Sequence, residues 1–469
     1  MMREMRYVLS FLLVVLCLVI EAQNDTTSYF VISDIRIEGN KTTKSSIITR
    51  ELTFEIGDTI SVSDIEQELK SSQENIRNSN LFNFVTLSCD TDNLTDNHVI
   101  INIEVTERWY FWLYPYLAYA DRNINSWYEA GNINRFTYGL EMEYKNFLGL
   151  KHSVMLTLIS GYNQNYGISY DVPYINNKQH FGLKFGLAYK RDKELAYMTE
   201  NNKVSYFNLD DEFADQSVCA YITPYYRFAH RNKLFLEFEY NDKIFHDSLA
   251  VLNPDFVNAQ GSRFQYFSLS AVFKNDYRDD NNYPLNGHYL ELMMKKVGLG
   301  VFKTSPNFFY AKVTMDWYKH IKGRWYWASN ITTRLSDDND PLYFLNQGLG
   351  YKNDFVRTYE LYVIDAVNYA LMKNNLKFTI LNPVTKYISF LSNERFGKIH
   401  FALYANVFFD CAYTWNMPDD PSSALNNKFI FGTGIGIDFV TYYDKVFRFE
   451  YGINDMGDTG LFIHFVAPI

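Results

Sequence analysis

Strand-length segments that alternate apolar and polar residues fill most of this chain beyond residue 108. Residues 400–415 are the clearest case, with one side made of Phe401, Leu403, Ala405, Val407 and Phe409 and the other of Ala402, Tyr404, Asn406, Phe408 and Asp410. The same pattern sets Leu234, Leu236 and Phe238 against Glu237 and Glu239, and Phe447, Phe449 and Tyr451 against Arg448 and Glu450. A period of two predicts β-strands with one apolar and one polar face.

The alternation also indicates the solvent that these strands face. Phe and Tyr each occur 38 times, aromatic residues make up 18% of the chain, and no apolar run after the first 22 residues could form a spanning helix. A closed barrel is the other structure that satisfies every backbone group in lipid. A soluble β-sandwich is the alternative, but its inner face would not carry so many charges. At roughly 22 residues per strand and loop, residues 108–469 predict a transmembrane antiparallel barrel of about sixteen strands.

The first residues have the features of a secretory signal peptide. Arg3 and Arg6 precede an apolar run from Val8 to Ile20, and Ala22 supplies a small residue for cleavage. Cys17 raises a lipoprotein site as an alternative, although it follows Leu16 within the apolar run. We predict a signal peptide over residues 1–22.

Residues 29–107 predict a small α+β domain of order β-α-α-β-β. A strand at 29–40 ends in a Gly39-Asn40 turn, and a short helix follows near 44–52. Ser63 and Glu66 are spaced as a capping box for the second helix. Two strands at 81–90 and 98–107 close the unit. With "I-x-G-N" near its start and "V-x-E" at its end, the segment resembles a POTRA domain, a periplasmic module that binds unfolded polypeptides at a sheet edge. A generic ferredoxin-like fold is the alternative.

A charged turn at 275–292 carries a second resemblance. Its sequence, "NDYRDDNNYPLNGHYLEL", is similar to the signature of the bacterial surface antigen barrel of the outer-membrane-protein-eighty-five superfamily. The residues at the family positions are Asp276, Arg278, Asp279, Pro284 and Gly287.

The segment "NDFVRTYELY" at 353–362 resembles the sixth-loop motif of the same superfamily. Val356, Arg357 and Tyr359, with the neighbouring Glu360, form the motif, and Thr358 replaces the usual glycine. The resemblance implies that the loop folds into the barrel and that Arg357 pairs with an inward aspartate, which corresponds to Asp410. Strand parity places Asp410 inward without reference to the family. Residues that merely line a wet lumen are the alternative.

The chain's late strands supply two further signals. Gly432, Gly434 and Gly436 alternate along one strand without a following helix, which excludes a dinucleotide-binding loop and predicts room for a folded-in loop. Gly460, Ile463 and Phe465 fit the last-strand pattern by which such barrels are recognised during assembly, although four residues follow Phe465.

Signals for catalysis, metal or nucleic acid are absent from the sequence. Cys89, Cys219 and Cys411 are widely spaced, the histidines have no metalloprotease spacing, and the net charge is −10. The acidic cluster Asp337, Asp338 and Asp340 could bind calcium, but solvated carboxylates are the favoured interpretation. We therefore expect neither an enzyme nor a cofactor.

The resemblance implies a bacterial outer-membrane protein with its POTRA domain in the periplasm. We expect an accessory, single-POTRA assembly factor, because the secretion branch carries two POTRA domains and a plug helix for which residues 22–29 leave no room. Expected partners are outer-membrane lipid and unfolded or nascent outer-membrane protein clients, with periplasmic chaperones or accessory subunits as further candidates. A secretion transporter of the same superfamily and a passive pore remain the alternatives.

Overall fold

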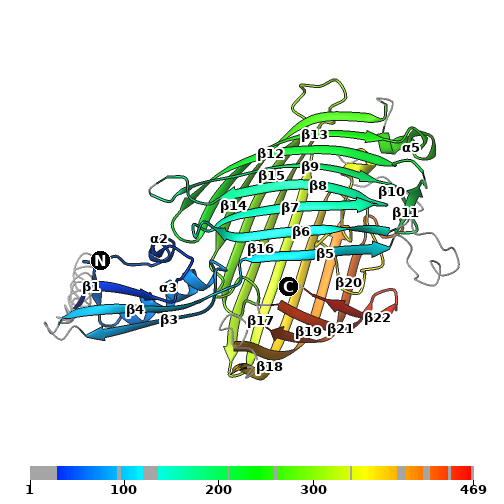
Figure 1. The fold of residues 1–469 in the computed structure, drawn as a ribbon. Helices are drawn as coiled ribbons and strands as arrows, with labels where there is room; N and C mark the ends of the chain where they lie inside the picture. The colour runs from blue at the N-terminus through cyan, green and yellow to red at the C-terminus, as the bar shows by residue number, and fades with distance from the viewer. Residues whose placement is uncertain are drawn as a thin grey trace, which may run out of the picture.

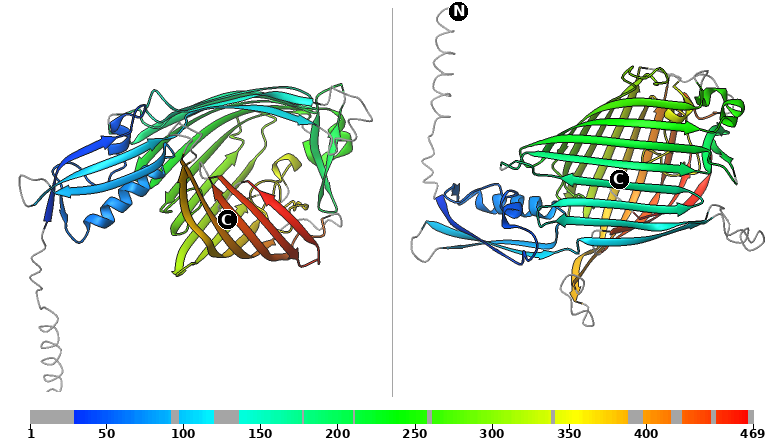
Figure 2. Two further views of the ribbon diagram at one scale, coloured as in Figure 1. Left: turned by 60° about the horizontal axis from the view of Figure 1, so that its bottom comes forward. Right: turned by 45° about the horizontal axis from the view of Figure 1, so that its top comes forward.

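The computed structural model describes residues 29–91, 97–119, 136–176, 178–209, 211–257, 261–337, 341–387, 398–415, 423–441 and 445–465. A small N-terminal domain lies against one end of a large sheet that curls into a barrel (Figures 1 and 2). We call this end of the barrel the near end and the opposite end the far end. The predicted signal peptide, residues 1–22, lies outside the described residues. Among the described residues, no helix is both long and apolar enough to cross a membrane.

The N-terminal domain packs two helices on a four-stranded sheet of order β2-β1-β4-β3. Its elements are β1 (Tyr29–Glu38), α2 (Ser45–Thr49), β2 (Thr59–Ser61), α3 (Ile65–Arg77), β3 (Phe82–Thr91) and β4 (His98–Glu107). β1 and β4 are parallel, and Ile32, Val99, Ile101 and Ile103 are fully buried beneath the helices. Alternation along β4 therefore sorts its residues between core and surface as the sequence predicts.

Two details of the predicted domain are wrong. The sequence pattern missed β2, whose three residues are too few to show a period. The capping box does not form either, because α3 begins after Asp64, and the hydroxyl of Ser63 donates to the Asp64 carboxylate instead.

The barrel is a single antiparallel sheet of sixteen strands, each hydrogen-bonded to its neighbour along the chain apart from one inserted hairpin. The strands are β5 (Phe111–Tyr119), β6 (Phe136–Phe147), β7 (His152–Gly161), β8 (Gln164–Val172), β9 (Phe181–Asp192), β12 (Asp215–Phe228), β13 (Asn232–Phe245), β14 (Arg263–Asp276), β15 (Gly287–Val297), β16 (Phe308–Lys322), β17 (Trp325–Ser336), β18 (Tyr369–Tyr387), β19 (Lys398–Thr414), β20 (Phe429–Thr441), β21 (Lys445–Asn454) and β22 (Thr459–His464).

The predicted division of the strands into an outer and an inner face is present throughout the sheet. On β19, Val407 and Phe409 are about half exposed on the outside, whereas Asn406, Phe408 and Asp410 are buried inside. The outer face is therefore apolar and suited to lipid, and the inner face carries the charges.

The first and last strands of the sheet leave a seam. Within the described residues, β5 pairs only with β6 and β22 only with β21, and a gap separates the two edges in Figure 1. Each edge therefore presents backbone groups without a strand partner.

Short elements lie at the far end. One of them is a hairpin of β10 (Glu194–Glu200) and β11 (Lys203–Asn208), which no sequence pattern indicated. The helices α5 (Ser248–Leu252) and α6 (Pro254–Val257) and the 3-10 turn η3 (Tyr343–Leu345) pack beside it. The sequence hid the hairpin because its strands are short and rich in polar residues.

Candidate functional site

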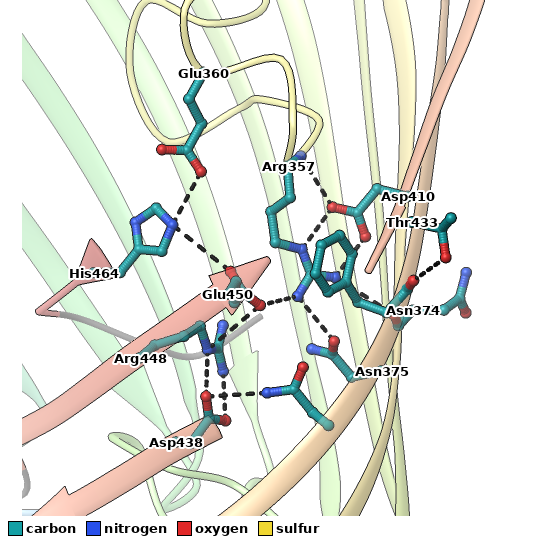
Figure 3. A network of polar contacts seen from close by, with 12 residues as sticks. Arg357, Glu360, Asn374, Asn375, Asp410, Thr433, Asp438, Arg448, Glu450 and His464 are labelled. Atoms are coloured by element: carbon teal, nitrogen blue, oxygen red, sulfur yellow. Dashed lines mark hydrogen bonds and ion pairs between the residues drawn. The ribbon is translucent and has the colours of Figure 1, made fainter. Parts of the chain in front are cut away.

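The connection between β17 and β18, residues 337–368, is the sixth at the far end, and we call it loop six. It folds back into the barrel and inserts Arg357 between loop and wall (Figure 3). Val356, Arg357 and Tyr359 are all almost completely buried. A long loop that is buried in this way needs polar partners for its charged groups, and the inner wall supplies them.

Arg357 and Asp410 form a bidentate ion pair. The Nη2 and Nε atoms of Arg357 donate to the two carboxylate oxygens of Asp410 at 2.6 and 2.7 Å, and the backbone N–H of Arg357 donates at 3.2 Å. Nη1 donates to Asn375 and Glu450, both at 2.9 Å, and the guanidinium lies 4.1 Å from the centre of the Phe408 ring. Paired charges with every donor engaged tolerate burial that an isolated charge would not.

A second arginine extends this network toward the near end. Arg448 donates to both carboxylate oxygens of Asp438, at 2.7 and 3.0 Å, and lies 3.9 Å from Glu450. Glu450 therefore stands between the two arginines, and the strands β20 and β21 hold the whole cluster rigidly. Sequence reasoning placed Arg448 and Glu450 on the polar face but did not identify Asp438, although it lies on the same face as the preceding glycines.

Glu360, the last residue of the predicted motif, faces the final strand. The Nε2 atom of His464 on β22 lies 3.0 Å from Glu360 and 3.7 Å from Glu450 (Figure 3). Tyr359 donates its hydroxyl proton to Asp455 in the β21–β22 turn. Loop six is thus attached to both strands that precede the seam.

Thr358 occupies the backbone conformation that the usual glycine would favour. Its φ of 80° lies in the left-handed region, and its buried hydroxyl has no hydrogen-bond partner among the described residues. Space for the side chain comes from Gly432 and Gly452, where an added Cβ atom would overlap Thr358. The loop tip therefore reaches the wall despite the substitution, and the predicted role of small inward residues holds for Gly432.

The predicted signature turn links β14 and β15 at the near end. Arg278 forms a bidentate pair with Asp276, and the Asp279 carboxylate accepts the backbone N–H groups of Asp280 and Leu285. Gly287 has a φ of 104°, and a Cβ there would overlap the Tyr277 carbonyl. Pro284 is buried beside Tyr283. These contacts fix the shape of a turn without regular hydrogen bonding.

Tyr283 was not identified from the sequence. This residue of the signature turn contacts the inner wall of the barrel. Its hydroxyl donates to Asp438 at 2.8 Å, its ring packs at a tilt against Tyr404, and the ammonium group of Lys377 lies 4.4 Å from the ring centre. The turn and loop six are therefore connected through Asp438, Arg448 and Glu450.

The N-terminal domain contacts the β6–β7, β8–β9, β12–β13 and β14–β15 connections at the near end of the barrel. Arg227 forms a bidentate pair with the buried Glu51 at 2.5 and 2.9 Å. Burial by itself would raise the pKa of the Glu51 carboxyl, but the Arg227 guanidinium outweighs that effect and holds the pKa well below its usual range. Asn78 donates to the Arg278 carbonyl of the signature turn at 3.1 Å. The backbone N–H of Lys44 donates to the carbonyl of Gly149 at 3.0 Å.

The predicted last-strand residues lie on and beside β22. Ile463 and Phe465 are at least half exposed on the outer face, and Phe465 packs edge-on against Phe447. A Cβ on Gly460 would overlap the Phe462 ring. Of the acidic cluster, Asp338 and Asp340 lie outside the described residues, and Asp337 lies 3.8 Å from Lys296.

Comparison with known proteins agrees with this architecture. Residues 30–108 match the protein family described as "POTRA: Surface antigen variable number repeat". No curated protein matches the sequence. CdiB from Escherichia coli has a similar structure, with 14% sequence identity and a TM-score of 0.52, covering 92% of this chain and 75% of CdiB.

Two further solved structures match more weakly. BamA from Haemophilus ducreyi lacking POTRA domains 1–3 shares 16% identity at a TM-score of 0.49, covering 92% of this chain and 83% of that one. CdiB from Acinetobacter baumannii shares 12% identity at 0.47, covering 93% and 74%.

These findings define the class of protein. The N-terminal unit matches the POTRA family, and 92% of the chain is similar in fold to Escherichia coli CdiB. The predicted fold, a sixteen-stranded barrel preceded by a small α+β domain that matches the POTRA family, is confirmed.

Proposed function

We propose that this protein assembles barrel proteins into the bacterial outer membrane, with its POTRA domain in the periplasm. Superfamily resemblance favours either such assembly or the transport of a polypeptide. The observation that carries our choice is the unpaired seam between β5 and β22. A client strand there would pair with backbone groups that no described strand uses, and its outer side chains would enter lipid directly.

The neighbourhood of the seam suits strand exchange. β22 has only six residues, and its attachment includes His464 beside Glu360 of loop six. A short strand has few backbone hydrogen bonds to lose, so a client can replace it at small cost. Loop six would then hold β21 in place while the edge remains available.

The contents of the barrel favour the seam over the lumen as the client's route. Loop six enters from the far end and Tyr283 from the near end, and both are held by buried ion pairs or hydrogen bonds. A cavity of about 610 Å³ lies between loop six and the barrel wall. A secreted polypeptide or an open pore would require these contacts to break, whereas a client at the seam would not.

The POTRA domain supplies a second edge for an extended client. β3 is an outer strand of its sheet and pairs with β4 across ten residues, in contrast to the three residues of β2 at the other side. Residues 85–90 of β3 offer a strand-length edge on which an unfolded polypeptide can add.

Site-specific photocrosslinking in the native host tests the seam directly. We expect a photoreactive residue at Ile463 of β22 or Leu113 of β5 to form adducts with newly made barrel proteins. The matched control is Leu236 on β13, which lies away from the seam and has a similar exposure of 47%, against 50% for Ile463 and 52% for Leu113. Adducts of equal yield at all three positions would contradict the proposal.

Depletion of the protein separates the alternative functions. Assembly predicts that several barrel proteins decline in the outer-membrane proteome, whereas transport predicts the loss of one secreted protein with barrel levels unchanged. A passive pore predicts neither change, and its open conductance in planar bilayers would survive Arg357→Ala.

A further inference from the structure

We propose that a cavity between the POTRA domain and the barrel binds a small dianion of the phosphate class. The cavity has a volume of about 280 Å³ and lies at the near end of the barrel. This volume is far above the roughly 10–15 Å³ that one water molecule requires. The proposal is independent of the function proposed above.

Three cations form a row along the wall of this cavity. Arg227 on β12 lies directly opposite Lys233 on β13, and Lys233 lies directly opposite Lys274 on β14. Like charges at directly opposed positions of a sheet repel one another. A row of three on neighbouring strands is therefore unfavourable unless negative charge lies among them.

The carboxylates of the chain neutralise the two outer members of the row. Arg227 pairs with Glu51, and Lys274 lies 2.8 Å from Glu291. The ammonium group of the central Lys233 has no hydrogen bond or ion pair with another described residue.

A second lysine without a partner reaches the same cavity from another element. Lys151 belongs to the β6–β7 turn, where its backbone N–H is held by the Asn146 side chain and φ is 62°. Its ammonium group has no hydrogen bond or ion pair with another described residue. The other charged residues of the lining are accounted for, since Arg231 pairs with Glu74 and Asp276 with Arg278. Two lysines thus remain, and their ammonium forms together match one dianion.

The electrostatics of Lys151 agree with an anion-binding role. Burial lowers the pKa of Lys151 to about 7, the nearby Glu51 opposes this effect, and Lys233, Arg227 and Arg50 add to it. A bound dianion would favour the charged lysine. Binding of sulfate, which does not titrate near neutral pH, should therefore be accompanied by proton uptake at pH 8 and by much less at pH 6.

The bound anion would also join two parts of the junction. The β6–β7 turn contacts the POTRA domain, as in the hydrogen bond from Lys44 to Gly149, whereas Lys233 belongs to the barrel wall. A dianion between Lys151 and Lys233 would fasten the turn to the wall and stabilise the docked position of the domain.

Titration of the detergent-solubilised full-length protein with inorganic phosphate tests the site. We expect saturable heat in calorimetry and a rise in the unfolding temperature beyond that caused by chloride at equal ionic strength. Lys151→Met and Lys233→Met should each weaken phosphate binding at least tenfold. Lys190→Met is the matched control, since this barrel lysine pairs with Asp192 and does not line the cavity.

The unfolding temperature without phosphate distinguishes binding from a structural role. Because Lys233 stands between two cations, Lys233→Met should raise the unfolding temperature in phosphate-free buffer while removing the response to phosphate. A structural lysine would instead lower the unfolding temperature in both buffers, which would overturn the proposal. Wild-type binding that persists in the double variant would overturn it too.

The source of the phosphate group can be resolved in nanodiscs. A response of the wild type to inorganic phosphate in phosphatidylcholine nanodiscs supports a free ion. A response only when phosphatidic acid is present, lost in the two lysine variants, supports the same site occupied by a phosphomonoester headgroup. The absence of both responses would refute the proposal.

Discussion

The Cγ2 atom of Thr358 lies 2.5 Å from the position that a Cβ atom on Gly452 would occupy. Gly432, on the neighbouring strand β20, faces the same side chain. A Cβ atom there would overlap the Thr358 hydroxyl. The threonine that replaces the usual glycine in loop six is therefore matched by two glycines in the barrel wall.

Substitution at either wall glycine should displace the loop tip. We expect Gly432→Ala and Gly452→Ala to lower the unfolding temperature of the barrel and to expose loop six to protease, because overpacking typically costs about 1–3 kcal/mol. The control is Gly167→Ala on β8, where the nearest atom to the new Cβ is 3.6 Å away. An equal effect at Gly167 would mean that glycine content, rather than contact with Thr358, matters.

Thr358→Gly should stabilise the barrel. It removes a left-handed conformation that costs an L residue about 1–2 kcal/mol and a buried hydroxyl without a partner, against roughly 0.5–1 kcal/mol for the flexibility of glycine. Thr358→Val is the informative comparison, since it removes the hydroxyl but keeps the strained backbone. Urea unfolding in lipid vesicles measures both; a gain in the valine variant alone would assign the effect to the hydroxyl.

Arg357 and Asp410 should be energetically coupled. Both side chains are almost fully buried, and breaking a buried ion pair by removing one partner typically costs about 3–5 kcal/mol. Arg357 keeps its pair with Glu450 when Asp410 is removed, so the full cost applies to Arg357→Ala and Asp410→Ala should cost less. A double-mutant cycle from unfolding free energies measures the coupling, and additivity within about 0.5 kcal/mol would dismiss the pair.

Strand parity explains why this pair could be predicted from the sequence. A period of two fixes which face Asp410 occupies, and the loop motif fixes the candidate arginine. Parity cannot state which inward residues meet, because that depends on strand register and on where the chain closes on itself. For this reason the links of Asp438 to Arg448 and Tyr283, and of Glu360 to His464, became visible only in the structure.

Elements without a clear period could not be predicted from the sequence for a related reason. β2 has three residues and the β10–β11 hairpin has polar strands, so neither shows an apolar face. The junction between POTRA domain and barrel was also beyond the sequence, since Glu51 and Arg227 are 176 residues apart and neither belongs to a motif.

The Glu51–Arg227 pair should make POTRA docking resistant to acid. The docked carboxyl has a lowered pKa, so its contribution is complete above the ordinary glutamate value of about 4.3 and is lost as pH falls through the lower docked value. Spin labels at Glu66→Cys and Lys322→Cys, in a protein without Cys89, Cys219 and Cys411, should report one distance from pH 8 to 5 and a broader distribution only below about pH 4.

A matched pair of substitutions tests whether the Glu51–Arg227 pair holds the POTRA domain in its docked position. Glu51→Gln should broaden the distance distribution already at pH 7, because the buried Arg227 loses its counter-charge. Arg263→Gln breaks a solvent-exposed pair with Asp242 away from the junction and should leave the distance distribution unchanged, because solvent screens such pairs. Opening of the wild-type junction between pH 7 and 5 would show that another group controls docking.

A path of polar contacts joins Arg357 to the signature turn through Glu450, Arg448, Asp438 and Tyr283. Tyr283→Phe removes a hydrogen bond to the buried Asp438, which should cost about 1.5–3 kcal/mol, while the ring can still pack against Tyr404. If Asp438, Arg448 and Glu450 act as one network, Tyr283→Phe and Arg357→Ala should be coupled although their side chains do not touch.

Tyr404→Phe is the control, because its hydroxyl has no hydrogen bond among the described contacts. Coupling above about 0.5 kcal/mol with Tyr283 but not with Tyr404 would show that POTRA docking at the turn and the position of loop six are linked. Additivity for both would mean that the two ends of the barrel are held independently.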